Sequence, residues 1–343
     1  MVEDPVCFVD LAPTLLSLAG LAKASQMQGE ALMGPHATPR RDYAFGMRNR
    51  MDERYDFVRT ATDGRYRYIR NYMPHRMWGM HGAFEWQAKG YQDWERQRLA
   101  GTLNPTQARF FGPKPFEEFY DLHTDPDEID NRIDDPDMAA RVNAFRAALD
   151  RHMLEINDNG FIPEGSSLEG YENSRQANAY PLQRVMAVAG TAGRGDVGGL
   201  PELRASLTDP NEVIRYWAAT GLLILGERAK PAAADLKRLA ASDPSPHVQV
   251  VAAEALVHTG QAREGVEWLA VLAAPDQSMP VRLQALNALT EIGEHARPAS
   301  PVIAQAAQDA QGYIRRAGVY LSAVLDGSYD PGNLPPEQGV GGG

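Results

Sequence analysis

The protein has 343 residues, with 34 basic and 45 acidic side chains, one cysteine and a formal net charge of −11. A chain of this length commonly folds into two domains. The acidic charge argues against general nucleic-acid binding, which needs a basic surface, and a single cysteine excludes an internal disulfide or a cysteine-based zinc cluster. No apolar run reaches the roughly 18 residues of a membrane-spanning helix.

The N-terminal half begins with a short helix and a β-hairpin. Asp10 is expected to cap a helix that ends at Gly20. Residues 55–72 place alternating β-forming side chains on both sides of Asp63-Gly64, a two-residue turn signal. The pattern therefore predicts two antiparallel strands joined at this turn.

The elements that follow complete an α+β pattern. Residues 77–94 are rich in aromatic side chains and show no period, so we expect an irregular insertion. Residues 117–122 are a third strand candidate, and residues 136–155 have the apolar spacing of an amphipathic helix. Residues 161–179 are a polar stretch without periodicity, which we interpret as a linker.

The C-terminal half is an internal repeat. Five similar segments start at intervals of 33 or 34 residues, at Pro181, Ile214, Val248, Val281 and Ile314. Each has apolar residues at helical spacing; four end at a glycine (Gly193, Gly226, Gly260 and Gly293), and four follow an aspartate that we expect to be an N-cap (Asp209, Asp243, Asp276 and Asp309). The pattern predicts an all-α solenoid over 180–326 that resembles short HEAT repeats, with a disordered tail over 327–343.

Positive charge is concentrated in one segment of this acidic chain. Residues 40–76 hold ten arginines, no lysine and five acidic residues. On the predicted hairpin, four of these arginines are expected to form a solvated outer face: Arg59, Arg65, Arg67 and Arg70. For Arg48 and Arg50, a solvated role and a ligand-binding role stay equally open. Guanidinium groups bind oxyanions through paired hydrogen bonds, so this segment is where an anionic ligand would bind.

Several familiar catalytic motifs do not occur in the sequence. It has no Gly-rich phosphate loop, no HExxH, no CxxC and no Gly-x-Ser-x-Gly. Cys7 lies in an apolar run, and we expect it to pack as a small hydrophobic residue. The repeat residues Trp217, His247, His258 and His295 occupy unrelated positions, which predicts no shared metal site.

Three separated segments resemble the C-terminal part of the formylglycine-dependent sulfatases. They are VCFVDLAPTLLSLAG (6–20), FVRTATDGRYRYIRN (57–71) and EEFYDLHTDPDEIDN (117–131). The resemblance implies an alkaline-phosphatase-like enzyme of the heparan N-sulfatase-like group, in which residues 1–35 end the large domain and residues 40–160 form a small α+β subdomain with an antiparallel sheet. We therefore expect a sulfatase C-terminal region over 1–160 fused to the HEAT-like solenoid.

The resemblance also shows which parts of such an enzyme this sequence lacks. The family's nucleophile lies in Cys/Ser-x-Pro-x-Arg, whereas Cys7 is followed by Phe8-Val9-Asp10, and no acidic calcium-binding pair precedes it. Calcium and formylglycine are expected in the full-length enzyme and not in this chain. We expect a truncated reading frame with no catalytic or metal residues of its own, inactive when isolated.

The arginine-rich segment lies where the family's active site opens. The resemblance assigns substrate-binding roles to Arg48, Arg50, Asp52, Arg54 and His75. Related proteins have histidine and aspartate where this sequence has Met47 and Asn49, so a histidine-dependent contact is in doubt. Three tryptophans of the aromatic insertion are candidates for stacking on sugar rings or for internal packing: Trp78, Trp86 and Trp94.

The favoured hypothesis is part of a hydrolase for sulfate esters or N-sulfates, with a sulfated glycan or a small sulfate ester as its ligand. The alternative is a non-catalytic adaptor whose solenoid binds a protein partner, and a phosphodiesterase or phosphatase of the same superfamily is a third possibility. We expect no nucleic-acid or membrane partner. The compartment stays open, because family members are commonly exported and this sequence shows no signal peptide.

Overall fold

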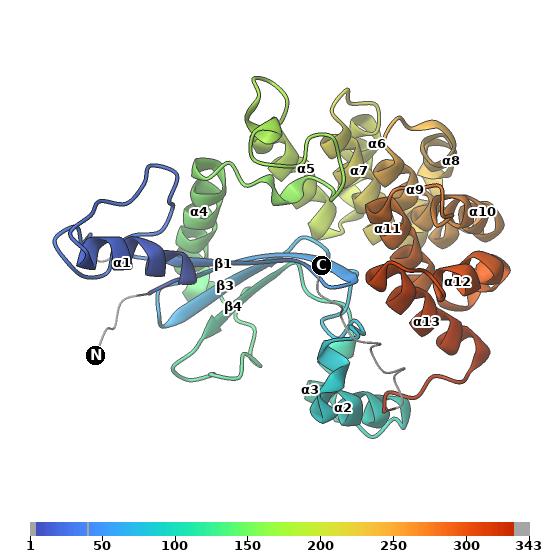
Figure 1. Ribbon diagram of the computed structural model, residues 1–343, viewed down its shortest axis with the longest axis horizontal. Helices are drawn as coiled ribbons and strands as arrows, with labels where there is room; N and C mark the ends of the chain where they lie inside the picture. The colour runs from blue at the N-terminus through green and yellow to red at the C-terminus, as the bar shows by residue number, and fades with distance from the viewer. Residues whose placement is uncertain (1–4, 40, 333–343) are drawn as a thin grey trace. The chain divides into compact units, whose positions relative to one another are not determined.

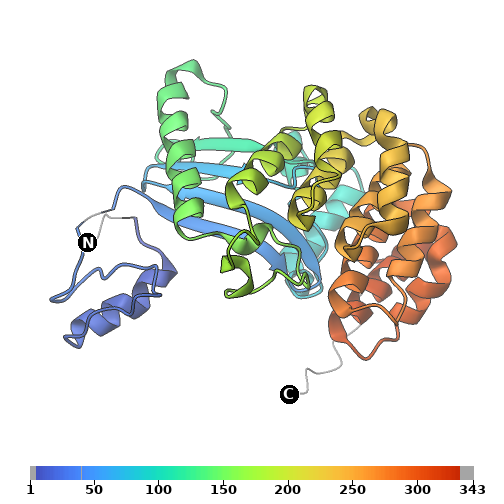
Figure 2. The ribbon, with the colours of Figure 1, turned by 90° about the horizontal axis from the view of Figure 1, so that it is seen from above.

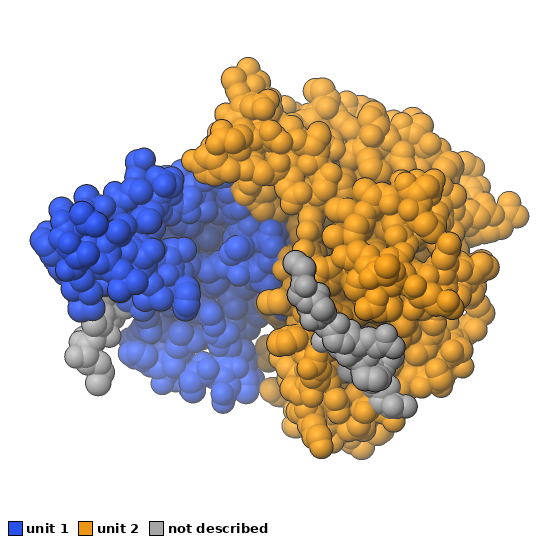
Figure 3. All heavy atoms as spheres, viewed as in Figure 1, with its two compact units in different colours: residues 1–49, 57–71, 115–158 blue, residues 50–56, 72–114, 159–343 orange. Residues whose placement is uncertain are grey.

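The computed structural model describes residues 5–39 and 41–332, so most of the predicted tail, from 333 onward, lies outside the described residues. Contacts divide the chain into two compact units that interleave along the sequence (Figure 3). The first unit comprises 1–49, 57–71 and 115–158, and the second comprises 50–56, 72–114 and 159–343.

The first unit contains a four-stranded sheet in the order β1-β2-β3-β4 (Figure 1). The strands are β1 (Ala44–Met51), β2 (Arg54–Thr62), β3 (Tyr66–Asn71) and β4 (Glu117–Asp121). The predicted hairpin and third strand are confirmed, and the pairs β2–β3 and β3–β4 are antiparallel. We assigned no strand to 44–51, because the polar side chains from Arg48 to Arg50 interrupt the apolar alternation that identifies a strand.

Helix α4 (Ala139–Glu155) packs on this sheet and confirms the predicted amphipathic helix. Its Phe145 ring meets Phe119 of β4 edge-on, with the ring centroids 5.4 Å apart. Arg146 of α4 donates through Nε and Nη2 to both carboxylate oxygens of Glu117, each at 2.7 Å. Apolar packing and a paired charge contact thus hold α4 to the same edge strand.

The prediction of a solvated arginine face on the hairpin is wrong for two of the four arginines. Arg59 and Arg70 are cross-strand partners and are 4% and 9% exposed. Arg59 forms a two-point contact with Asp158 (Nε–Oδ2 2.6 Å, Nη2–Oδ1 3.0 Å), and Arg70 lies 2.5 Å from Asp150. Like charges directly opposite each other repel, so each guanidinium is retained inside only because it has its own carboxylate.

The other two hairpin arginines are more exposed and lie near the turn. Arg65 pairs with Asp121 at 2.8 Å and Arg67 pairs with Glu128 at 2.6 Å, with arginine side chains 50% and 41% exposed. Water reaches both side chains of the Arg67–Glu128 pair, so that pair contributes little to stability, whereas the Asp121 side chain is only 4% exposed.

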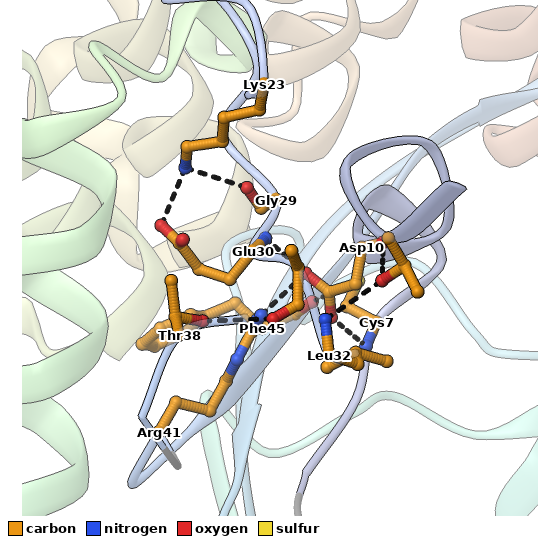
Figure 4. A network of polar contacts seen from close by, with 11 residues as sticks. Cys7, Asp10, Lys23, Gly29, Glu30, Leu32, Thr38, Arg41 and Phe45 are labelled. Carbon is orange, nitrogen blue, oxygen red and sulfur yellow. Dashed lines mark hydrogen bonds and ion pairs between the residues drawn. The ribbon is translucent and has the colours of Figure 1, made fainter. Parts of the chain in front are cut away.

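The N-terminal helix α1 (Leu11–Leu18) turns its polar side inward. Asp10, Thr14 and Ser17 are buried, and their side chains accept hydrogen bonds from the backbone of the loop at 30–36. The Asp10 carboxylate also accepts from Cys7 N at 2.7 Å and from Arg41 Nη2 at 2.6 Å (Figure 4). Asp10 is therefore the N-cap residue by position, but its side chain ties loops together instead of capping the helix.

The loop opposite α1 approaches very closely at Gly29. A Cβ added there would lie 2.0 Å from the carbonyl oxygen of Val9, so only glycine fits. Burial alone would raise the pKa of Asp10, but hydrogen bonds from Glu30 N, Cys7 N and Arg41 outweigh it and hold the pKa below its usual value. The carboxylate is thus kept ionised as the centre of this network.

The apolar side of α1 faces outward. Five large apolar side chains in and beside the helix are 48–86% exposed: Phe8, Val9, Leu11, Leu15 and Leu18. A helix in water normally buries this side, so the arrangement indicates a surface that is suited to cover by another apolar surface.

The second unit contains the predicted repeats, of which the first four have two helices each (Figures 1 and 2). The first helices are α5 (Leu182–Arg194), α7 (Glu212–Leu225), α9 (Pro246–His258), α11 (Met279–Glu291) and α13 (Gly312–Asp326). The second helices are α6 (Leu200–Ser206), α8 (Ala233–Ser242), α10 (Ala262–Leu272) and α12 (Ser300–Ala306).

Glycines stop the first helices, as predicted, with one correction. Gly226, Gly260 and Gly293 have positive φ at or just after a helix end. Gly193 does not stop α5, because this helix continues to Arg194 and Gly195 takes the left-handed conformation instead. The signal was misplaced by two residues because both positions are glycine.

None of the four repeat aspartates is an N-cap, and three of them pair with an arginine of the preceding repeat. The residues at the N-cap positions of α7, α9, α11 and α13 lie two places later: Asn211, Ser245, Ser278 and Gln311. One oxygen of Asp243 accepts from Ser245 N at 2.8 Å, while Arg215 of the preceding repeat donates to both carboxylate oxygens, at 2.8 and 2.9 Å. Asp209 and Asp309 likewise pair with arginines of the preceding repeats, at 2.5 and 2.6 Å.

The aromatic insertion also belongs to the second unit and is more ordered than predicted. It contains the first part of α2 (Lys89–Leu99), where we expected no regular structure over 77–94, and α3 (Pro105–Ala108) follows. Helix α2 is mostly polar and lacks an apolar period, so tertiary contacts rather than amphipathicity stabilise it. Across the described ranges, we find no helix long and apolar enough to cross a membrane.

The buried Arg59–Asp158 pair gives a direct stability prediction. Arg59→Met leaves the Asp158 carboxylate buried without its cation, and we expect the free energy of unfolding to fall by about 3–5 kcal/mol. Urea denaturation followed by circular dichroism measures the loss.

The matched control is Arg67→Met, because Arg67 lies on the same hairpin in an exposed pair. We expect a change below about 1 kcal/mol for this variant. Equal losses for the two variants would contradict the buried position of Arg59.

Candidate functional site

The tip of the β1–β2 hairpin, residues 50–56, belongs to the second unit and packs on repeat helices α11 and α13. Asp52 forms the turn with a φ of 47°, and its carboxylate lies 4.0 Å from Arg316 of α13. We call residues 50–56 the arginine tip, because Arg50 and Arg54 lie at either side of this turn.

Asn287 of α11 holds the arginine tip from two directions. Its Oδ1 accepts from Arg54 Nη1 at 2.5 Å, and its Nδ2 donates to the Glu53 carbonyl oxygen at 2.8 Å. Arg54 is 5% exposed, and its Nε donates to the His81 carbonyl oxygen at 2.5 Å. One amide therefore fixes both the backbone and a side chain of the tip.

Tyr320 of α13 completes the support of Arg54. The guanidinium carbon of Arg54 lies 5.1 Å from the centre of this ring, within the range of a cation–π contact. The His81 ring stacks on the same tyrosine at 4.1 Å. Burial and the neighbouring Arg54 lower the pKa of His81 to about 3, so this imidazole is neutral.

Glu53 is a deeply buried acid of the tip. It is 1% exposed; its Oε1 accepts from Ala83 N at 2.6 Å, and its Oε2 has no hydrogen-bond partner within the described residues. Burial raises the pKa of Glu53 against the opposing charge of Arg54. We singled out neither Glu53 nor His81 from the sequence, and only their burial distinguishes them.

Arg50 is the arginine of the tip that remains reachable from solvent. Its Nε lies 2.6 Å from Glu164 Oε2, and its Nη1 donates to the Asp52 carbonyl oxygen at 2.5 Å. The ring of Tyr313 lies beneath it, 5.0 Å from the guanidinium carbon. Its side chain is 27% exposed and that of Glu164 is 34% exposed. This pair forms part of the rim of a cavity.

The cavity has a volume of about 70 Å³ and lies between the arginine tip and helices α7, α9 and α11. Its polar lining includes Arg76, which pairs with both carboxylate oxygens of Glu254 at 2.7 Å. Two guanidinium groups, of Arg50 and Arg76, are balanced by two carboxylates, of Glu164 and Glu254. This volume holds a few water molecules, and the balanced lining has no excess positive charge for an anion.

The five predicted substrate-binding residues lie in different environments. Arg50, Asp52 and Arg54 share the arginine tip, whereas Arg48 is half-buried in β1 within the first unit. Both ring nitrogens of His75 are buried without hydrogen-bond partners among the described residues, and burial lowers the pKa of this histidine far below its usual value. Their roles in substrate binding stay predictions, and Arg50 is the most accessible charged group of the tip.

The candidate sugar-stacking tryptophans take part in internal packing. Trp86 is 1% exposed and donates through Nε1 to Glu95 at 2.5 Å. Trp94 stacks on Phe110 at 4.3 Å, and Lys114 Nζ lies 4.6 Å from the centre of the Trp78 ring.

We find no group of three histidine, cysteine, aspartate or glutamate side chains that would hold a metal in ranges 5–39 and 41–332. The calcium that the family resemblance implies thus has no ligand set in the part of the chain described. Cys7 donates weakly through Sγ to the Phe45 carbonyl oxygen at 3.3 Å.

The two-sided contact of Asn287 predicts a local effect. Asn287→Ala leaves the Arg54 guanidinium and the Glu53 carbonyl without their partner, and we expect a loss of about 1–3 kcal/mol of stability. Hydrogen exchange should show faster exchange confined to residues 50–56 and their neighbours.

Gln305→Ala is the matched control, because Gln305 is an exposed amide on repeat helix α12. We expect it to leave exchange in the arginine tip unchanged. Unaltered protection of residues 50–56 in Asn287→Ala would show that the tip does not depend on α11.

Comparison with known proteins finds two similarities. A family model for HEAT repeats matches residues 175–257 and 233–323, which confirms the repeat prediction. The chain is also similar to an ulvan-active sulfatase of Formosa agariphila, with 32% identity over 183 residues. That match covers 52% of this chain and only 30% of the relative. The protein thus combines a sulfatase-like segment with HEAT repeats.

Proposed function

We propose that this chain supplies an oxyanion-recognising hairpin, and the repeat scaffold that holds it, to a sulfatase acting on sulfated glycans. The observation that carries the proposal is the 32% identity to a sulfatase, combined with the arginine-rich segment 40–76 in an acidic protein. The relative's name associates that protein with ulvan, a glycan substrate that we extend to this chain only as a hypothesis.

The chemistry of the tip supports a sulfated ligand. Arg50 belongs to the tip, and the family resemblance assigns it to substrate binding together with Arg48, two residues earlier in the sequence. Each guanidinium offers a planar fork of N–H donors that matches the oxygens of a sulfate group. Because the charges in the nearby cavity are balanced, the sulfate would bind at its rim and not inside it.

The finer assignments belong to the same proposal. The heparan N-sulfatase-like subtype and the alkaline-phosphatase-like fold rest on the family resemblance. Since the chain spans less than a third of the relative's length, we propose that the bond-breaking groups lie in a large domain beyond the sequence described here. We expect no turnover of an aryl sulfate by the 343-residue chain alone.

The exposed apolar side of α1 supports the proposal that a separate large domain carries the bond-breaking groups. We propose that it packs on the large domain, since exposed leucines in and around a helix favour association with another apolar surface. Replacing Leu11, Leu15 and Leu18 together by glutamine should lower the fluorescence of a bound apolar dye such as ANS and reduce self-association in sedimentation. Circular dichroism should stay unchanged, because these side chains are 48%, 68% and 56% exposed.

Val271→Gln on α10 is the control for this surface, because Val271 is also 54% exposed but lies on a repeat helix. We expect little effect on dye binding. If the triple variant binds as much dye as the unaltered chain, the surface at α1 does not behave as an apolar patch.

A protein-binding adaptor is the alternative, and HEAT repeats are compatible with it. The two hypotheses differ in what the arginines do. A sulfatase component needs Arg48 and Arg50 to bind sulfated glycan, whereas an adaptor binds its partner through the repeats and has no such requirement.

Binding of sulfated ulvan oligosaccharides to the 343-residue chain tests the proposal by calorimetry. We expect binding that weakens about tenfold or more in Arg48→Gln/Arg50→Gln, since charge-assisted hydrogen bonds are lost. Desulfated oligosaccharides of equal length should bind weakly. Exposed Arg263→Gln/Arg297→Gln in the repeats is the control for net charge. Equal weakening in the control pair, or no binding at all, would contradict the proposal.

A further inference from the structure

The Arg50–Glu164 ion pair occupies the position that an anionic ligand would take. The Glu164 carboxylate lies 2.6 Å from Arg50 Nε, with both side chains partly exposed at the rim of the cavity. A carboxylate and a sulfate group present similar oxygen atoms to a guanidinium. An arginine that is engaged by a carboxylate of its own chain is less available to a ligand.

The backbone around Glu164 holds this residue next to Arg50. The next residue, Gly165, has a φ of +87°, and a Cβ added to it would lie 2.7 Å from Pro280 at the start of α11. Its backbone N–H donates to Glu169 Oε2 at 2.7 Å, and Ser166 hydrogen bonds to Glu212 of α7. The segment that carries Glu164 is thus fixed on the repeat helices.

The other contacts of Arg50 allow an anionic ligand to replace the Glu164 carboxylate. The Asp52 carbonyl accepts from Nη1, and the Tyr313 ring supports one face of the guanidinium. Both contacts persist if Glu164 moves away, so Arg50 keeps its position. A partly exposed ion pair is also weak, because water competes for both charges.

We propose that Glu164 is an internal competitor that a sulfate group displaces from Arg50, and that it thereby sets the affinity and charge selectivity of the arginine tip. The inference rests on the proposed function, since it takes a sulfated glycan as the ligand. It assigns a role to residues 161–179, which we had interpreted only as a linker.

The test is calorimetric binding of a sulfated ulvan oligosaccharide to five forms of the full chain. They are the unaltered chain, Glu164→Gln, Arg50→Gln, the double variant and Glu172→Gln. Glu172 is an exposed acid of the same segment with no ion pair inside the described ranges, so it controls for net charge. Thermal unfolding of each form verifies that it is folded.

We expect Glu164→Gln to bind about two- to fivefold more tightly, the change that corresponds to losing a partly exposed ion pair. Arg50→Gln should bind more weakly, and the double variant should match Arg50→Gln, because without the arginine there is nothing to compete for. Glu172→Gln should match the unaltered chain.

The outcomes separate this inference from the proposed function. If Arg50→Gln weakens binding but Glu164→Gln does not strengthen it, or strengthens it equally in the Arg50→Gln background, Glu164 is not a competitor. If Arg50→Gln has no effect, or no form binds, the proposed function fails and the inference falls with it.

Discussion

The second unit depends on buried charge pairs that tie irregular segments to the repeat helices. Arg76 is the clearest case, because it is 9% exposed and pairs with both carboxylate oxygens of Glu254 on α9. Burial alone would lower the pKa of Arg76, but the charges of Glu254 and Glu291 outweigh burial and raise it. A buried guanidinium without a carboxylate partner is strongly destabilising. The Arg76–Glu254 pair therefore fixes the segment after β3 on the repeat helices. Arg54 in the arginine tip is also buried, and its hydrogen bonds go to the neutral oxygens of Asn287 and of the His81 carbonyl.

These contacts change how the HEAT repeats are interpreted. A repeat array usually provides a binding surface for another molecule. Here helices α9, α11 and α13 bind the chain's own arginine tip and the segment at 72–81, through Glu254, Asn287 and Tyr320. The repeats therefore act as an internal scaffold for the arginine tip. The tip carries two arginines and three acidic residues, and charges removed from water need fixed partners of this kind.

The sequence predicted the elements whose signals are local. The 33–34-residue repeat, the Asp63-Gly64 turn and the apolar spacing of α4 all depend on neighbours along the chain, and each was confirmed at or near its predicted place. β1 was missed because arginines obscure its alternation, and α2 because it has no apolar stripe. The repeat aspartates resembled N-caps, yet their distant arginine partners, such as Arg215 for Asp243, decide their role.

By itself the sequence determined that a mixed α+β region is followed by a solenoid. It also determined that positive charge is concentrated at residues 40–76. Both follow from the repeat period, the turn residues and the composition, which are properties of the chain alone. Only the tertiary structure decided which arginines are buried and which remain available. Arg59 and Arg50 have the same side chain and lie nine residues apart, but one is enclosed with Asp158 and the other pairs with Glu164 at a rim. The difference comes from the solvent exposure of each guanidinium and from the partners that folding places next to it. Neighbouring residues in the sequence determine neither of these.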